Sequence, residues 1–361
     1  MPRPSHFKIN LDALDHNVSE LSRLAGHRKK MAVVKANAYG HGAITCAGTL
    51  EKSVDAFAVA ITEEGIELRE AGISKPILVL QGPHSSDDLD AIVRYALCPA
   101  ISNYQQLEWL RQLTDKLDQV WLKVDTGMHR LGFDPSEVED VRATLRDLGT
   151  QNITLMSHLA DAEDIDSSVT HRQTARWKNL ESVIQGTVNF KQSASLSNST
   201  STVGALSHEE SWVRLGYSLY GGSLIALPQG LTLKPVMTFI SRVAAIRWIE
   251  TGETVGYGGR WVAKRRSRIA TIPVGYGDGY PRAAADGTPI GTPYGTVPLA
   301  GKVSMDMITA DITDMPDIEF GTEVTLWGQL PRIDDVAAHC DTIGYELCTR
   351  VTERTPRIFS R

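Results

Sequence analysis

MAVVKANAYGHG, residues 31–42, places a short apolar run directly before Lys35 and a segment with two glycines. An apolar run of this length, followed by turn residues, is typical of a buried strand. Seven more runs follow, and segments such as TEEGIELREAG (62–72) and NYQQLEWLRQL (103–113), with apolar residues at helical spacing, lie between them. The runs are AFAVA (56–60), ILVL (77–80), LCPAIS (97–102), VWLKVDT (120–126), ITLMSHL (153–159), KQSASLSN (191–198) and VRLGYSLYG (213–221). Eight strand–helix units predict a (β/α)8 barrel, while the same alternation permits an open doubly wound sheet.

The pattern changes after Lys234 to short β-like runs separated by Gly and Pro. These are PVMTFISRVAAI (235–246), ETVGYGG (253–259), SRIATIPVGYGDGY (267–280), GTVPLAGKVSMDMITADI (295–312) and EVTLWG (323–328). Such runs predict an all-β domain. The segment LPQGLTLKP (227–235) has the Pro and Gly of a linker, so we expect a barrel over 1–232 and a β-strand domain over 233–361.

The composition is that of a soluble globular protein rather than of a nucleic-acid or membrane protein. A chain of 361 residues usually forms two domains, and 42% hydrophobic and 22% charged residues are ordinary for a globular protein. The net charge of −6, with no Lys/Arg-rich block, excludes an electrostatic footprint for nucleic acid or anionic membrane. Four cysteines without metal-ligand spacing, and no apolar stretch of membrane-span or signal length, lead us to expect free thiols, no metal and a cytoplasmic location.

Polar side chains stand at the ends of five predicted strands. A (β/α)8 barrel has its active site at the C-terminal ends of its strands, so these are the candidate site residues. They are Lys35, Lys123, His158, Asn198 with Ser199, and Arg214. Lys35 alone reads as an ordinary surface lysine, but at a barrel mouth its amine is able to form a Schiff base.

The string VKANAYGHG (34–42) closely resembles the cofactor-binding signature of alanine racemases, and the resemblance covers nearly the whole chain. Further segments match in family order: EEGIELREAGI (63–73), KVDTGMHRLGF (123–133), VRLGYSLYG (213–221), VGYGG (255–259), PVGYGDGYPR (273–282), VSMDM (303–307) and GYELCTR (344–350). The resemblance implies a (β/α)8 barrel with a C-terminal β-domain. It also implies a homodimer in which each active site is completed by the partner's β-domain.

The resemblance assigns the cofactor, pyridoxal phosphate, to residues of the barrel. Lys35 forms the internal aldimine, Tyr39 binds the phosphate, and Arg214 faces the pyridine nitrogen. Further residues of this shell are His158, Asn198, Ser199, Gly216, Tyr217 and Tyr345. An Arg at the ring nitrogen cannot accept its proton, so the ring stays unprotonated, which limits side reactions such as transamination.

Racemisation of alanine needs two acid/base groups, one on each face of the reacting carbon. Lys35 is one, and by resemblance Tyr257, reaching the opposite subunit's cofactor, is the other. A tyrosine has an ordinary pKa of about 10, so positive charge or hydrogen bonds near it, as from His158 close to Arg214, must favour the phenolate.

The substrate's carboxylate is assigned to Arg130, a task suited to a guanidinium fork. In many family members the lysine that matches Lys123 is carbamylated and orients this Arg, which the sequence leaves open. His129 stands where the family usually has glycine. Tyr276, Met305 and Asp306 match residues of the partner chain that wall the pocket and restrict substrate size.

Three other functions remain to be weighed. An amino-acid decarboxylase of the same general fold usually places an acid at the pyridine nitrogen, and Arg214 argues against it. A racemase acting on serine or on a broader set is the nearer competitor, since the sequence does not separate it from one acting on alanine. A cofactor-carrying binding protein related to the barrel alone lacks the β-domain with Tyr257. The chain also does not distinguish supply of D-alanine from its breakdown.

Overall fold

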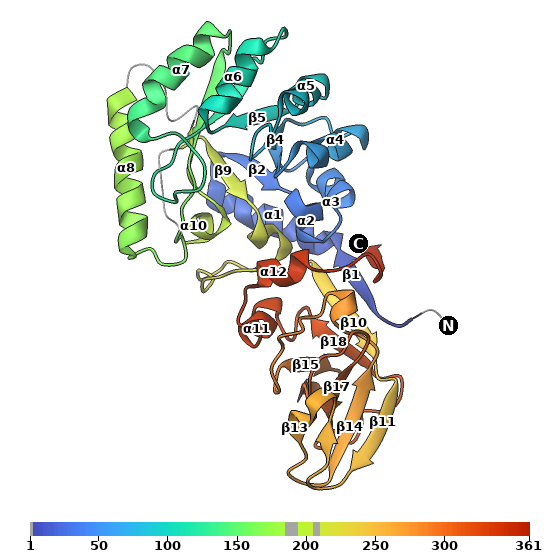
Figure 1. Ribbon diagram of the computed structural model, residues 1–361. Helices are drawn as coiled ribbons and strands as arrows, with labels where there is room; N and C mark the ends of the chain where they lie inside the picture. Colours follow the sequence, from blue (N-terminus) through green and yellow to red (C-terminus); the bar gives the residue numbers. More distant parts are fainter. Residues whose placement is uncertain (1–2, 185–193, 205–209) are drawn as a thin grey trace.

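The computed structural model describes residues 3–184, 194–204 and 210–361, with a helix-surrounded barrel at one end and a β-rich region at the other (Figure 1). Eight parallel strands form one sheet in the order β8-β7-β6-β5-β4-β3-β2-β9. They are β2 (Lys29–Val33), β3 (Ala56–Val59), β4 (Ile77–Val79), β5 (Cys98–Ile101), β6 (Gln119–Lys123), β7 (Asn152–Met156), β8 (Ala194–Ser195) and β9 (Trp212–Leu215). Each corresponds to one predicted run, although residues 191–193 of the seventh run lie outside the described residues.

The two end strands of this sheet meet, so the sheet closes. The Ser211 N–H donates to the Ala194 carbonyl over 3.1 Å, and the Arg214 N–H donates to the Ser197 carbonyl over 3.2 Å. The predicted barrel is therefore confirmed, and the open doubly wound alternative is wrong.

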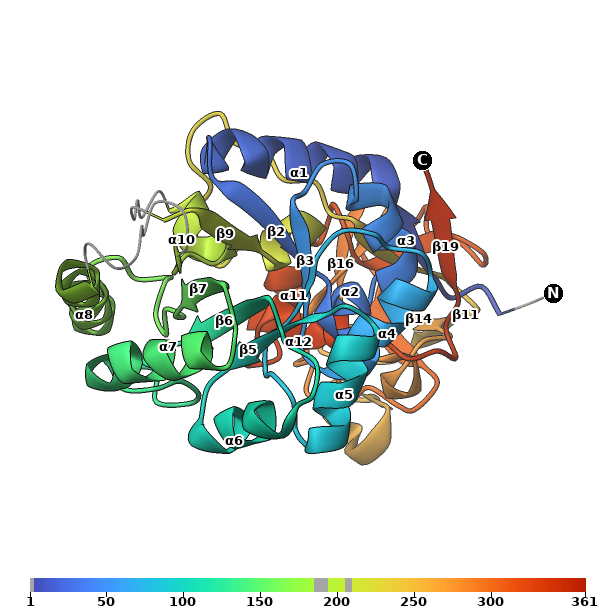
Figure 2. The same cartoon turned by 90° about the horizontal axis from the view of Figure 1, so that it is seen from above.

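Helices follow the strands and cover the outside of the barrel (Figure 2). They are α1 (Leu11–Ala25), α3 (Ala43–Leu50), α4 (Thr62–Glu70), α5 (Ser86–Arg94), α6 (Tyr104–Gln112), α7 (Val138–Asp147) and α8 (Ser168–Ile184). The short helix α10 (Ser199–Val203) follows β8 and is buried over its whole length. The start of α6 is fixed by its N-cap, because Asn103 Oδ1 accepts the N–H of Gln106 over 3.0 Å. Within the described residues, no helix combines the length and apolar character needed to cross a membrane.

The C-terminal region consists of β-sheets with two short helices. Its six-stranded sheet has the order β16-β15-β18-β10-β1-β19, beside a three-stranded sheet β11-β14-β17 and a hairpin β12-β13. The elements are β10 (Met237–Arg242), β11 (Ala245–Ile249), β12 (Thr254–Val255), β13 (Trp261–Val262), β14 (Ser267–Ile272), β15 (Pro289–Thr292), β16 (Gly295–Pro298), β17 (Ile308–Asp311), β18 (Glu323–Trp327), α11 (Ile333–Ala338), α12 (Gly344–Thr349) and β19 (Arg357–Ser360). The predicted β-rich character of this region is confirmed.

One strand of this sheet, β1 (His6–Asn10), comes from the N-terminus and pairs antiparallel with β10 and parallel with β19. The sequence analysis assigned no strand here, and the domain boundary at 232/233 stays a prediction. The rings of Phe7 and Phe239 lie 4.3 Å apart and belong to the hydrophobic core that also contains Leu215 and Tyr220 of the barrel side. This shared core ties the β-rich region to the barrel.

Candidate active site

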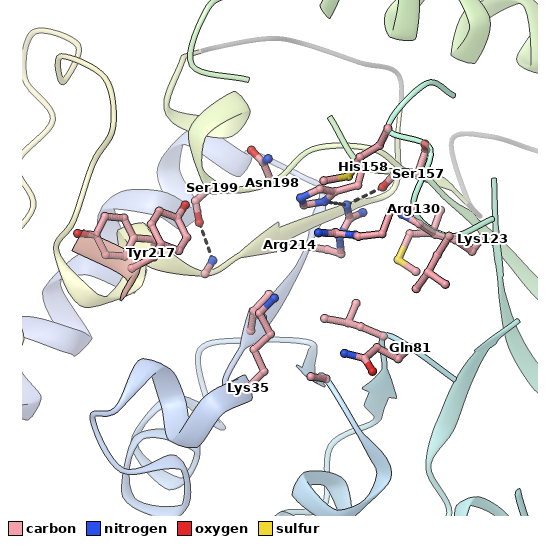
Figure 3. A pocket seen from close by; sticks show the side chains of 18 of the residues that line it. Lys35, Gln81, Lys123, Arg130, Ser157, His158, Asn198, Ser199, Arg214 and Tyr217 are labelled. Atoms are coloured by element: carbon pink, nitrogen blue, oxygen red, sulfur yellow. Dashed lines mark hydrogen bonds between the residues drawn. The ribbon is translucent and has the colours of Figure 1, made fainter. Parts of the chain in front are cut away.

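A cavity of about 350 Å³ lies at the end of the barrel where the strands finish (Figure 3). Eleven of the predicted site residues line it: Lys35, Tyr39, Lys123, Arg130, His158, Asn198, Ser199, Arg214, Gly216, Tyr217 and Tyr345. Most follow strands β2 and β6–β9, and Tyr345 comes from α12 of the C-terminal region. Closure of the barrel thus collects side chains from residues 35 to 345 around one space, as expected for the catalytic end of such a barrel.

Lys35 begins a strained turn, α2 (Lys35–Tyr39), which is left-handed rather than an ordinary α-helix. Ala36, Asn37, Ala38 and Tyr39 all have φ between 51° and 54°. Left-handed backbone costs a non-glycine residue roughly 1–2 kcal/mol, and such strain is characteristic of functional sites. In Figure 3 the Lys35 side chain rises from this turn toward Arg214.

The cavity is rich in cationic groups. Lys35, Lys123, Arg130 and Arg214 all line it, and Asp125 is the one carboxylate among the described lining residues. Burial, together with the charge of Arg130, lowers the pKa of Lys35. Burial and the charges of Arg214 and Arg130 hold the pKa of Lys123 well below its usual range. Both amines therefore hold their protons weakly, and a neutral lysine amine is a nucleophile and a base.

Arg214 is fixed on the cavity wall by five hydrogen bonds. Its Nη1 donates to the carbonyl and hydroxyl of Ser195 at 3.0 and 2.6 Å. Its Nη2 donates to the Ser157 carbonyl at 2.7 Å, to His158 Nδ1 at 3.2 Å and to the Leu196 carbonyl at 3.3 Å. Burial lowers the pKa of Arg214 to about 10, which leaves it charged at neutral pH. All these bonds use Nη atoms, so Nε–H is left without a bond among the described residues.

Hydroxyl and amide groups gather on the opposite side of the cavity from Arg130 and Lys123 (Figure 3). Ser199 Oγ accepts the Gly216 N–H over 2.6 Å, and the rings of Tyr217 and Tyr345 stack at 4.0 Å. Burial raises the pKa of Tyr345 to about 12 and that of Tyr39 further, so both phenols remain protonated donors. A Cβ at Gly216 would lie 2.7 Å from the Tyr39 hydroxyl, so the close approach there requires glycine. This side of the cavity can hold an anion such as a phosphate.

Four predicted site residues do not line this cavity. They lie on the surface of the C-terminal region, where Tyr257, Met305 and Tyr276 are 68%, 52% and 39% exposed and the Asp306 side chain is 54% exposed. Two of their loops are joined, since the Tyr276 N–H donates to the Ser304 carbonyl over 3.1 Å and the Gly277 N–H to the Met305 carbonyl over 2.9 Å. Within one chain these four residues therefore make no contribution to the lining of the cavity.

Comparisons with known proteins identify the family. Residues 9–224 match the model of the alanine racemase N-terminal domain, and residues 236–359 match that of the alanine racemase C-terminal domain. The chain belongs to the alanine racemase family. An alanine racemase of Alteromonas mediterranea is 42% identical over 360 residues, which is 99% of each chain, and one of Chromohalobacter salexigens is 43% identical over 363 residues, 99% of this chain and 98% of that one.

Solved structures agree with the assignment to the alanine racemase family, whose members are isomerases. The biosynthetic alanine racemase from Pseudomonas aeruginosa superimposes with a TM-score of 0.93 at 37% identity, over 99% of this chain and 100% of that one. The alanine racemase from Acinetobacter baumannii gives a TM-score of 0.91 at 35% identity over the same shares.

His129, at a position for which the resemblance to alanine racemases led us to expect glycine, has a left-handed φ of 53°. That backbone conformation explains why glycine suits the position. His129 Nδ1 lies 3.2 Å from Asp125 Oδ2, and Asp125 Oδ1 accepts the N–H groups of Gly127, Met128 and His129 at 2.8–3.1 Å. The loop that carries Arg130 is therefore organised around Asp125 with histidine in place.

The sequence analysis did not assign several residues that the structure brings to the site. Gln81, Asp125 and Ser157 line the cavity. Gln81 follows the ILVL run, so its strand-end position was the available signal. His41 and Glu64 act on the turn after Lys35 from outside the cavity, and their contacts join segments that no local pattern connects.

Proposed function

We propose that this chain interconverts L-alanine and D-alanine with bound pyridoxal phosphate, using Lys35 and Tyr257 of the partner subunit as its two proton carriers. The observation that supports it best is the cavity in which a lysine of lowered pKa meets Arg130, Arg214 and a group of hydroxyl and N–H donors. This donor set fits an anionic, phosphorylated cofactor together with a substrate that carries a carboxylate.

The residues present fit pyridoxal phosphate. Bound there, the cofactor supplies an electron sink that makes the α-hydrogen of an amino acid removable. Lys35 holds it through Nζ, and Arg214 offers its Nε–H to the ring nitrogen. The phosphate is bound by Tyr39, Ser199, Tyr345 and the backbone around Gly216 and Tyr217, with Asn198 and His158 in the same shell. A charged Arg214 accepts no proton and so leaves the ring nitrogen unprotonated.

Removing a proton from one face of the α-carbon and returning it to the other face requires two acid/base groups. Burial and the charge of Arg130 lower the pKa of Lys35, so a larger share of Nζ is neutral and able to accept a proton on one face of the reacting carbon. Tyr257 of the partner subunit serves the other face.

The second subunit is part of this proposal. Tyr257, Tyr276 and Met305 are exposed large side chains of the C-terminal region, and none of them lines the cavity of its own chain. We infer a homodimer in which this surface closes the partner's cavity. Arg130 and the Met305 backbone amide of the partner subunit then bind the carboxylate of alanine. Tyr276 and Asp306 of the partner subunit limit the size of the substrate.

Lys123 is the candidate for carbamylation. Its pKa lies well below the usual range because of burial and of the charges of Arg214 and Arg130. A neutral amine adds to carbon dioxide and releases a proton, giving a carbamate anion. That anion pairs favourably with the same two guanidinium groups, and it orients Arg130 toward the substrate.

The test is to incubate the purified protein and pyridoxal phosphate with L-alanine in deuterated buffer. Optical rotation, α-hydrogen exchange and carbon dioxide are followed together. Loss of rotation with deuterium incorporation and no carbon dioxide is the expected result, and L-serine in a parallel reaction measures specificity. Release of carbon dioxide overturns the proposal in favour of a decarboxylase. Cofactor binding without exchange of either amino acid indicates a binding protein.

A further inference from the structure

We propose that His41 and Glu64 are positioning residues, which hold the left-handed turn after Lys35 so that its amine stays directed into the cavity. The inference rests on the proposed function, in which Lys35 carries the cofactor. Neither side chain is among the described residues that line the cavity, so His41 acts through the backbone of the turn, while Glu64 acts through that backbone and also through its charge, which opposes the lowering of the Lys35 pKa.

His41 binds the carbonyl end of the turn. It is fully buried, and its Nδ1 lies 2.9 Å from the Ala38 carbonyl and 2.8 Å from the Tyr39 carbonyl. Carbonyl oxygens only accept, so Nδ1 carries the hydrogen and donates to both. Burial also lowers the pKa of His41 to about 4, which keeps the ring neutral with this tautomer fixed.

The His41 ring also connects the turn to the barrel wall. It stacks on Tyr220 with the ring centroids 4.5 Å apart, and the Tyr220 hydroxyl donates to the Val33 carbonyl over 3.0 Å. Val33 is the last residue of β2, two positions before Lys35. Both ends of the segment that carries Lys35 are thus bound to one aromatic pair.

Glu64 binds the amide end of the turn. From the first turn of α4, its Oε1 accepts the Ala36 N–H over 2.6 Å and its Oε2 accepts the Ala60 N–H over 2.7 Å. Ala60 directly follows β3, so the carboxylate ties the residue after Lys35 to the end of the neighbouring strand. A run of four left-handed, non-glycine residues relaxes unless its surroundings hold it. Relaxation would turn both Lys35 and Tyr39 away from their present directions.

The experiment compares two substitutions that separate the two interactions of His41, ring stacking and hydrogen-bond donation. His41→Phe keeps a ring on Tyr220 but removes the donor, whereas His41→Asn keeps a donor near the Nδ1 position without the ring. The full chain is titrated with pyridoxal phosphate, and the Lys35 adduct is trapped by borohydride and located by peptide mass analysis. The absorbance of the bound cofactor is also followed against pH.

We expect His41→Phe to weaken attachment to Lys35 roughly tenfold, as for loss of one buried hydrogen bond, and to shift the pH titration of the absorbance. In His41→Asn, the affinity of attachment and the pH titration of the absorbance should both lie close to those of the unaltered protein. Adding Ala36→Gly to His41→Phe should also recover attachment, because glycine adopts the left-handed conformation without strain. Attachment and titration in His41→Phe equal to those of the unaltered protein overturn the inference.

Glu64→Gln tests the inference independently of His41. It remains usable even if circular dichroism shows that the His41→Phe variant does not fold. The amide accepts one N–H and places its own N–H₂ against the other, so attachment to Lys35 should weaken. Glu63→Gln, exposed one position earlier on α4, is the matched control and should change nothing. Equal attachment in the Glu64 and Glu63 variants contradicts the inference. Absence of any Lys35 adduct in the unaltered protein contradicts the proposed function itself.

Discussion

Arg214 Nη2 donates a hydrogen bond to His158 Nδ1 over 3.2 Å, and this contact places a neutral imidazole beside a permanent cation. Burial, and then the charge of Arg214, holds the pKa of His158 well below its usual range. Because Nδ1 accepts this bond, the proton of the neutral ring is on Nε2. Arg214 therefore faces the cavity as a charged donor that takes up no proton near neutral pH. A bound ring nitrogen next to it is consequently expected to stay unprotonated.

Replacing Arg214 with Glu should lower racemisation at least roughly 100-fold, as for loss of a preorganised charged donor, and raise the yield of pyruvate per alanine turned over. A carboxylate allows the ring nitrogen to be protonated, which favours transamination. Pyruvate is measured with lactate dehydrogenase. Arg214→Lys, which keeps the charge, is the control, and melting curves verify folding. An unchanged pyruvate ratio in both variants would argue against the role of Arg214.

Mixing two inactive variants should restore activity if each site is shared between subunits. Lys35→Ala and Tyr257→Phe homodimers each lack one proton carrier in both sites. After subunit exchange, a mixed dimer holds one intact site, so a statistical mixture should recover about a quarter of the unaltered activity. Exchange is verified by mass spectrometry with a tag on one variant. Mixed dimers without activity would show that Lys35 of one subunit and Tyr257 of the other do not form a shared site.

Arg130 should set the pH range in which Lys35 reacts. Its positive charge lowers the pKa of Lys35, after burial, so more of the amine is neutral at a given pH. Arg130→Gln removes this repulsion and raises the Lys35 pKa. The rate of pyridoxal phosphate attachment should then fall at neutral pH, with its pH profile moved to higher pH. Arg130→Lys keeps the charge and should leave the profile near that of the unaltered protein.

Carbon dioxide should matter if Lys123 is carbamylated. Protein prepared and assayed in carbon-dioxide-free buffer should lose activity, and bicarbonate should restore it. Lys123→Ala removes the anion from beside Arg130, so it should raise the KM for alanine more than it lowers kcat. A small carboxylate such as acetate is then expected to restore part of the loss. Indifference of the unaltered protein to carbon dioxide, with no mass increase at Lys123, excludes the modification.

His129 tests the backbone of the Arg130 loop. Its φ of 53° is strained for histidine, and the contact of its exposed side chain with Asp125 contributes little to stability. His129→Gly should therefore be more stable than His129→Ala by about 1 kcal/mol, because only glycine takes this φ without strain. Urea unfolding of the two variants measures the difference. Equal stabilities would mean that the loop relaxes to another conformation.

The sequence by itself predicted eight strand–helix units and six of the residues that line the cavity, whereas closure of the sheet decided between a barrel and an open sheet. The eight apolar runs and the helical spacing of residues 62–72 and 103–113 are local patterns. They correspond to strands and helices because the spacing of their apolar residues matches the side of each element that is buried. A closed parallel barrel then forces the C-terminal ends of its strands together, so Lys35, His158 and Arg214 meet although 179 residues separate the first from the last. The likeness to a known family added Tyr39, Arg130, Gly216, Tyr217 and Tyr345.

Only the tertiary structure decided features that depend on contacts between distant segments. β1 joins β10 across more than 200 residues, a pairing for which an isolated five-residue strand carries no signal. The left-handed φ values of Ala36–Tyr39 go against local preference and exist because His41 and Glu64 bind both ends of the turn. The lowered pKa of Lys35 likewise comes from burial and from Arg130. Local patterns fix the elements, but strain and charge at a site depend on long-range packing, which sequence spacing does not encode.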